Sequence, residues 1–332
     1  MFGDVLFGIL PLFLIMIVGY AASHALRFAD NVEPALNTFV FYIALPALLF
    51  TVVADADPQS GVPLEFLLVT TAATTVFAGL VGLLTRYVLR RSLAQSLAMS
   101  LSTGFGNVSY LGIPVVLGVL GSSAGLAAGM GQLVHNVLFM VGFPVLAQLV
   151  LPTRRGDQRR RSARTVAMTV RNALLRNPVT WAMLAGGAVL YFGWSLPDPV
   201  ERAAQMLAAV AAPGALFTIG LSLRRTVRRI RGRAADQRSA ARMSLPAMVL
   251  MVLGKLLLLP ALTVVSLVWL APDLDPLWFN TAVLMAAMPV SATAYIMAAS
   301  ETGDGEPTAV GIVLTCALAV LTLPTLAQLF LR

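Results

Sequence analysis

Charged side chains are scarce in this sequence: only 11% of its 332 residues are Asp, Glu, Lys or Arg. An average soluble domain contains about 25%. Hydrophobic residues make up 58% of the chain, and its mean hydropathy is +0.84. A water-soluble protein of this size could not bury so much apolar surface, whereas a lipid bilayer accepts it. The composition therefore excludes an ordinary soluble protein and predicts an all-α polytopic membrane protein.

Cysteine and histidine are also rare. The one cysteine, Cys316, lies in an apolar run and cannot form an intramolecular disulfide, so we expect a buried, unreactive thiol. The two histidines, His24 and His135, form no cluster with metal-ligand spacing, and no nucleophile has an evident base nearby in sequence. We expect no metal, no cofactor and no enzymatic activity. Turnover by the purified protein would revive the alternative of an intramembrane enzyme.

Ten hydrophobic segments are long enough to cross a bilayer, which takes about 20 apolar residues in a helix. They cover residues 4–26, 34–54, 63–89, 94–120, 124–151, 178–195, 199–222, 245–270, 276–299 and 307–331. The first segment counts as a span because residues 1–4 lack the positive charge of a cleavable signal peptide. The sequence therefore predicts ten transmembrane helices.

The basic residues are concentrated between hydrophobic segments. Sixteen of the 23, all Arg, lie in residues 154–176 and 224–242, which is typical of cytoplasmic loops. This distribution argues against a nucleic-acid partner despite the net charge of +8. Loops on the opposite side carry acidic residues or no charge, apart from Arg202. We expect a multi-pass protein of the cell inner (plasma) membrane with both termini outside. The Arg-rich stretches could instead bind anionic lipid or serve regulation.

The largest interruption of the hydrophobic pattern divides the chain into two halves. We expect a first five-helix repeat in residues 1–151, an Arg-rich cytoplasmic loop in 152–177 and a second repeat in 178–332. An odd number of helices per half inverts the second half, as in many secondary transporters. Pro46 in the second segment and Pro213 in the seventh are each followed closely by an Ala-Leu-(Leu)-Phe stretch. These positions support an inverted 5+5 repeat.

The fourth and ninth segments carry helix-breaking residues at corresponding places. Residues 104–114 read GFGNVSYLGIP, and residues 288–295 read MPVSATAY. Proline and clustered glycine interrupt a helix, and the freed backbone groups must lie against protein or a water-filled cavity. Paired interruptions in corresponding helices indicate a transporter binding site. Two proline kinks in packed helices are the alternative.

Broken helices can bind an anion. Each restarted helix presents unpaired N–H groups and the positive end of its dipole. Polar side chains at the breaks could add hydrogen bonds, and two tyrosines could provide aromatic walls or hydroxyls. The predicted substrate site comprises Gly106, Asn107, Ser109, Tyr110, Gly112, Pro114, Pro289, Ser291, Thr293 and Tyr295.

Two ionisable side chains lie inside predicted spans, where charge is expensive and often functional. Lys255 could pair with substrate, stay neutral, or extend to the interface. His135, beside Gln132 and Asn136, could relay protons or be a hydrogen-bonded structural residue. The fourth and ninth segments contain no Asp or Glu. This absence favours an anion moved by facilitated diffusion or with a proton over sodium symport.

These motifs resemble the auxin efflux carrier family, which includes plant auxin carriers and bacterial malate and malonate permeases. The resemblance extends over the whole chain and is carried by residues 41–50, 106–114, Pro213 with 220–223, Gly254 and Lys255 with Pro260, and Pro289. It implies ten helices with broken, crossing helices 4 and 9. It also implies a homodimer, in which a transport subdomain drawn from both repeats moves against a scaffold in an elevator-like cycle. Asn107 matches the asparagine that binds substrate carboxylate in plant members.

Two departures from the family pattern are visible. Thr293 stands where many members have Asn, and the loop after the fifth segment has only about 25 residues. The predicted function is a secondary transporter of small organic carboxylate anions, auxin-like or dicarboxylate. A sodium-coupled bile-acid-type symporter has a related architecture, and sodium-dependent binding would identify it. A membrane receptor would bind its ligand without flux.

Overall fold

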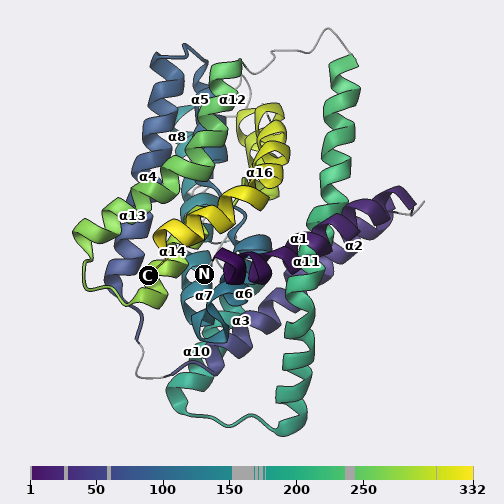
Figure 1. Cartoon of the computed structure of the whole chain (residues 1–332), viewed down its shortest axis with the longest axis vertical. Coiled ribbons are helices and arrows are strands. Elements are labelled where there is room, and N and C mark those ends of the chain that lie inside the picture. Colours follow the sequence, from purple (N-terminus) through teal and green to yellow (C-terminus); the bar gives the residue numbers. More distant parts are fainter. Residues whose placement is uncertain are drawn as a thin grey trace.

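The computed structural model describes residues 2–25, 29–57, 61–151, 168, 171, 175, 177–235, 244–303 and 305–331. Every regular element within these residues is a helix (Figure 1). Arg27, almost all of the predicted loop 152–177 and the end of the second Arg-rich stretch, 236–242, lie outside the described residues.

The first half of the chain folds into helices that cover the five expected segments. Their bounds are α1 (Phe2–Ala25), α2 (Ala29–Phe39), η1 (Val40–Ala44), α3 (Leu45–Ala54), α4 (Leu64–Tyr87), α5 (Leu93–Gly104), η2 (Val108–Gly112), α6 (Ile113–Leu120), η3 (Ser122–Ala124), α7 (Gly125–Asn136), η4 (Val137–Gly142) and α8 (Phe143–Val150).

The second half is also helical. Its elements are α10 (Pro178–Phe192), α11 (Asp198–Ala235), α12 (Leu245–Leu253), η6 (Gly254–Leu258), α13 (Leu259–Leu270), α14 (Pro276–Ala286), α15 (Ala292–Met297), η7 (Ala298–Thr302) and α16 (Glu306–Phe330). In the described part of the chain, six helical runs are long and apolar enough to cross a membrane. Four shorter apolar helices accompany them: Gly8–His24, Val108–Leu120, Pro178–Phe192 and Pro276–Ala286. The helical class is confirmed, while the inverted repeat stays a prediction.

Four prolines lie within helical runs without ending them. Pro46, Pro114, Pro144 and Pro260 are each the second residue of an α-helix that follows directly on a π-helical turn. Proline lacks an N–H, and in an α-helix its ring collides with the carbonyl four residues earlier. A wider π turn separates the ring from that carbonyl. The helical runs therefore continue through these prolines.

The helices pack in two groups. In the first, α1 runs along α11, and α3 contacts both α10 and α11. In the second, α4 packs against α5 and α13, and α16 packs against α5, α12 and α15. Helix α16 also contacts α1 and α11, so it joins the two groups. Glycines allow α1 and α11 to approach closely, because a Cβ on Gly220 would collide with the backbone of Met16. Figure 1 shows α11 running almost the full height of the molecule beside α1 and α2.

The length of α11 corrects one expectation. The seventh segment was expected to end at residue 222 and to be followed by an Arg-rich loop, but α11 continues to Ala235. Arginine and alanine are strong helix formers, and no proline follows Pro213 in this helix. The 38-residue helix is about 57 Å long at 1.5 Å per residue, well beyond a hydrocarbon core of about 30 Å.

Candidate functional site

Two helices stop inside the protein and restart a few residues later. Helix α5 ends at Gly104 before η2 begins at Val108, and α14 ends at Ala286 before α15 begins at Ala292. An antiparallel bridge between Gly106 and Val290 joins the two interruptions. Within it, the N–H of Asn107 donates to the carbonyl of Pro289 (2.8 Å), and the N–H of Ser291 donates to Phe105 (3.0 Å). The bridge therefore pairs backbone groups that the breaks would otherwise leave unsatisfied.

Each restarted helix is capped by a polar residue at the break. The Oδ1 atom of Asn107 accepts a hydrogen bond from the N–H of Tyr110 (3.3 Å). The Oγ atom of Ser291 accepts one from the N–H of Thr293 (3.2 Å). Asparagine and serine are preferred caps because their short side chains reach the second or third N–H of the helix. The N–H groups of Leu111 and Ala294 donate to the carbonyls of Asn107 and Ser291, so only the N–H groups at the very start of each helix lack an acceptor within it.

A cavity of about 320 Å³ lies at these two helix starts. Six predicted site residues line it: Gly106, Asn107, Ser109, Tyr110, Ser291 and Thr293. Its volume falls within the range of small-molecule pockets. The two breaks are about 180 residues apart in sequence. In the structure they and their capping residues meet at one cavity.

Four predicted residues do not line this cavity. Gly112 packs under α14, because a Cβ there would lie 2.9 Å from the Sδ atom of Met285. Pro114 is buried at the start of α6, and Pro289 contributes its carbonyl to the bridge. Tyr295 packs against Gly305, where a Cβ would lie 2.9 Å from the tyrosine ring. These residues shape the breaks rather than the wall of the cavity.

The opposite wall consists of residues that the sequence analysis missed. Glu33 and Asn37 come from α2, and Thr218 and Ser222 come from α11. The hydroxyl of Tyr110 donates a hydrogen bond to Oδ1 of Asn37 (2.8 Å), which ties η2 to α2. Ser222 belongs to the motif 220–223, but that motif does not indicate a cavity, and only the packing of α2 and α11 brings these residues to the breaks.

Glu33 also makes an ion pair. Its carboxylate lies 3.7 Å from the guanidinium of Arg225 on α11. The side chain of Glu33 is 15% exposed and that of Arg225 is 44% exposed. An acidic and a basic group therefore meet where α2 and α11 border the cavity.

Lys255 reaches the bridge without lining the large cavity. It lies in η6 and is completely buried, so its amine does not extend to the surface. Its Nζ atom donates a 3.0 Å hydrogen bond to the carbonyl of Ala286. A Cβ on Gly106 would lie only 2.9 Å from the same Nζ atom. The lysine thus occupies the space that glycine leaves open beside the bridge.

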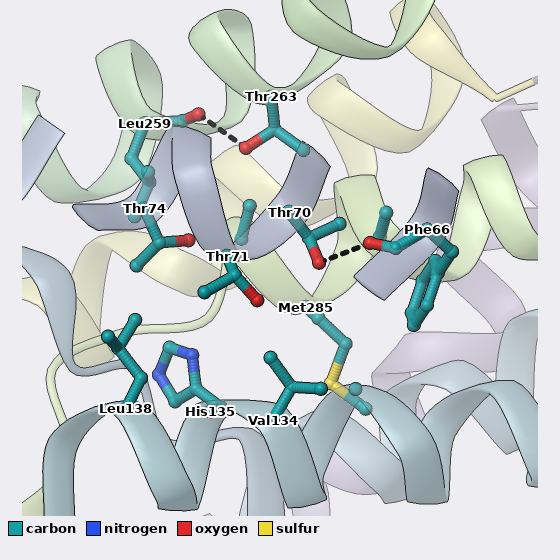
Figure 2. A pocket seen from close by; sticks show the side chains of 13 residues that line it. Phe66, Thr70, Thr71, Thr74, Val134, His135, Leu138, Leu259, Thr263 and Met285 are labelled. Carbon is teal, nitrogen blue, oxygen red and sulfur yellow. Dashed lines mark hydrogen bonds between the residues drawn. The ribbon is translucent and has the colours of Figure 1, made fainter. Parts of the chain in front are cut away.

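His135 connects the bridge to a second, smaller cavity of about 40 Å³ between α4, α7, α13 and α14 (Figure 2). Threonines from two helices line this cavity: Thr70, Thr71, Thr74 and Thr263. The Nε2 atom of His135 accepts a hydrogen bond from the backbone N–H of Gly106 (3.0 Å). The imidazole also packs against the rings of Phe105 and Phe139.

Comparison with known proteins gives matches over nearly the whole chain. A family model described as "Membrane transport protein" matches residues 4–327. A Rhizobium meliloti protein named "Putative malonate transporter" is 26% identical over 323 residues, which cover 97% of this chain and 94% of that protein. "Auxin efflux carrier component 8" of Arabidopsis thaliana is 23% identical over 373 residues, covering 97% and 95%. An "Uncharacterized transporter" of Methanothermobacter thermautotrophicus is 24% identical over 323 residues, covering 95% of each chain.

Proposed function

Because the chain belongs to the membrane transport protein family, which is the auxin efflux carrier family, we propose that it is a secondary transporter of small organic carboxylate anions. Family membership and the apolar helices make it a multi-pass membrane transporter and not an enzyme. The substrate class is our proposal. Malonate, malate and indole acetate are the first candidates, since relatives are named for malonate and auxin transport.

One observation carries the proposal: the starts of η2 and α15 meet at the same cavity. Each helix N-terminus is equivalent to about half a positive charge, so two of them can balance about one carboxylate. Among the described residues that line the cavity, none is Lys or Arg. The attraction for an anion would therefore come mainly from backbone N–H groups, with Ser109 and Thr293 as further donors.

The transport cycle that we propose is an elevator within a homodimer, built on an inverted 5+5 repeat with crossing helices 4 and 9. In this cycle α1, α3, α10 and α11 would form the scaffold, and α4, α5 and α13 would move together with α14, which contacts α4 and α13. The cavity lies between α2 and α11 on one side and the two breaks on the other. Sliding one group against the other would expose it alternately on the two sides of the membrane. The Arg-rich stretches support both termini outside.

The test is current or flux in proteoliposomes. Currents on a solid-supported membrane are recorded with malonate, malate and indole acetate for wild type, Asn107→Ala and Asn107→Asp. Asn107→Ala also removes a cap, whose loss costs about 0.5–2 kcal/mol of stability. Asn107→Asp keeps the capping oxygen and adds a negative charge, so it should fold normally and bind anions poorly. Melting temperatures of both variants separate lost binding from lost folding.

The outcomes distinguish the competing functions. A saturable current that disappears in Asn107→Asp supports an anion site at the breaks. Currents that require sodium, and vanish when choline replaces it, would instead identify a sodium-coupled symporter. Saturable binding without flux would identify a receptor. If none of the three anions produced either a current or radiolabel exchange, the proposal would be overturned.

A further inference from the structure

The hydrogen bond between Gly106 and His135 fixes the protonation state of the imidazole in this conformation. The Nε2 atom accepts the Gly106 N–H, so this nitrogen carries no proton. A neutral imidazole then holds its proton on Nδ1. Figure 2 shows the ring extending from α7 into the small cavity, toward Thr71 and Thr74. The Nε2 atom of the histidine therefore faces the bridge, and the rest of the ring faces a polar cavity.

A second proton can bind only at Nε2, and it competes directly with Gly106. A doubly protonated imidazole is a donor at both nitrogens and accepts no hydrogen bond. The Gly106 N–H is shared, because it also donates to the carbonyl of Gly104 (3.1 Å). Protonation would remove the bond to His135 and leave this N–H bonded to Gly104 alone. Because Gly106 pairs with Val290 and precedes Asn107, the change would reach the bridge and the start of η2.

The small cavity can solvate the charged ring. Its volume of about 40 Å³ is enough for a water molecule, which needs about 10–15 Å³ on this measure. The hydroxyls of Thr70 and Thr71 donate to the carbonyls of Phe66 and Leu67, which leaves their oxygens as acceptors. A water molecule there could accept from Nδ1–H and donate to a threonine oxygen. An imidazolium at this position would therefore have a partner for its second N–H.

The charges around His135 link proton binding to anion binding. Among the described residues bordering the small cavity, α4, α13 and α14 contribute only threonine and apolar side chains. Lys255 of η6 is an ionisable neighbour, because its Nζ atom lies beside Gly106, the residue that donates to His135. Two neighbouring positive charges repel strongly in a low-dielectric interior. A carboxylate at the starts of η2 and α15 would offset that repulsion, and by linkage each ligand would then favour the other.

We infer that His135 binds the proton that this carrier moves together with its anion, so that the transport reaction is proton–anion symport. The inference rests on the proposed function. The proton comes from water on the side of anion entry, occupies the Nε2 lone pair while the anion is bound, and returns to water on the other side. No other bond is made or broken. The anion and the proton occupy separate sites that are joined by the backbone of Gly106.

Proton uptake on anion binding tests the inference. Calorimetric titrations of purified protein with malonate, malate and indole acetate are repeated in two buffers that differ in ionisation enthalpy, which yields protons taken up per anion. Wild type and His24→Gln should take up about one proton for each anion. His135→Gln should bind the anion with uptake reduced to near zero. His24 is the matched control because it is exposed on α1.

The possible failures are distinguishable. Anion binding without proton uptake in wild type, or with full uptake in His135→Gln, would overturn the inference and leave the proposed function intact. Absence of binding by all three anions would overturn both. A second measurement, without ligand, keeps the inference testable if His135→Gln misfolds. The nitrogen-15 spectrum of His24→Gln contains the signals of a single histidine, His135. At alkaline pH that ring should show protonated Nδ1 and bare Nε2, and the opposite tautomer would overturn the inference.

Discussion

The Nζ atom of Lys255 donates a 3.0 Å hydrogen bond to the carbonyl oxygen of Ala286, the last residue of α14. A helix that ends inside a membrane protein leaves its final carbonyls without backbone donors. The amine supplies a donor there, and in its protonated form it places a positive charge at the negative end of the helix dipole. The same Nζ atom lies beside Gly106, so this charge is next to the bridge.

Replacing Lys255 with Met should weaken anion binding more than folding. The change removes the positive charge beside the bridge, and we expect affinity to fall about tenfold, equivalent to about 1.4 kcal/mol. Replacing a buried charge by an apolar side chain of similar size is often neutral for stability, so the melting temperature should change little. Arg202→Met, at an exposed position on α11, is the control and should leave affinity unchanged. Calorimetry would contradict the prediction if both variants bound alike.

Gly106→Ala should destabilise the protein and reduce flux. The new Cβ would lie 2.9 Å from Nζ of Lys255 and 3.3 Å from the carbonyl of Met288, so the bridge must shift. Overpacking of this kind costs about 1–3 kcal/mol. Gly79→Ala is the matched control on α4, where a Cβ meets nothing within 4 Å. It should be unchanged or more stable by about 0.5–1 kcal/mol. Equal melting temperatures for the two variants would show that the bridge accommodates a Cβ at position 106 without strain.

The breaks could be predicted from sequence because their causes are local. Gly104, Gly106 and Pro289 weaken or interrupt a helix wherever they occur, and Asn107 and Ser291 are typical residues for a helix start. The pairing of Gly106 with Val290 has no comparable local signal, because it joins segments about 180 residues apart. The helix bounds followed from long apolar runs. The continuation of α11 to Ala235 did not, since charge pattern indicates topology and not where a helix ends.

The part of the cavity wall that α2 and α11 contribute could not be predicted for the same reason. Asn37 is an isolated polar residue near the end of α2, and Ser222 belongs to the motif 220–223 in the middle of α11, which carries no sign that it faces a cavity. Their role depends on which helices pack together. Lys255 and His135 were recognisable as unusual because they are ionisable groups inside apolar runs. Their common contact with Gly106 is visible only in three dimensions.

Ser222→Cys should report access to the large cavity. Ser222 lines that cavity, whereas the native Cys316 is buried and only 4% exposed. The wild-type chain therefore serves as its own control and should not be modified by a membrane-impermeant thiol reagent. We expect Ser222→Cys to be modified from one side of sealed vesicles and to be protected several-fold by a bound carboxylate. Equal modification from both sides at all anion concentrations would contradict a gated cavity.

Tyr110→Phe should shift the conformational equilibrium rather than abolish binding. The variant loses the 2.8 Å hydrogen bond from Tyr110 to Asn37, which connects η2 to α2 in this conformation. A single hydrogen bond contributes about 1 kcal/mol, or about fivefold in a population ratio. In the Ser222→Cys background, the modification rate should therefore change by up to about fivefold in the Tyr110→Phe variant. Tyr42→Phe, at an exposed position in η1, is the control and should leave the rate unaltered.

The ion pair between Glu33 and Arg225 should tune how easily an anion enters the cavity. Glu33 lines the cavity and repels a carboxylate, and the guanidinium 3.7 Å away offsets that charge. Glu33→Gln should lower the KM for anion transport, and Arg225→Gln should raise it. Since the pair is partly exposed, each effect should correspond to about 0.2–1 kcal/mol, or up to about fivefold. The double variant should return close to the wild-type KM, and all differences should shrink at high ionic strength. If both single variants moved KM in the same direction, the pair would act through packing and not through its charge.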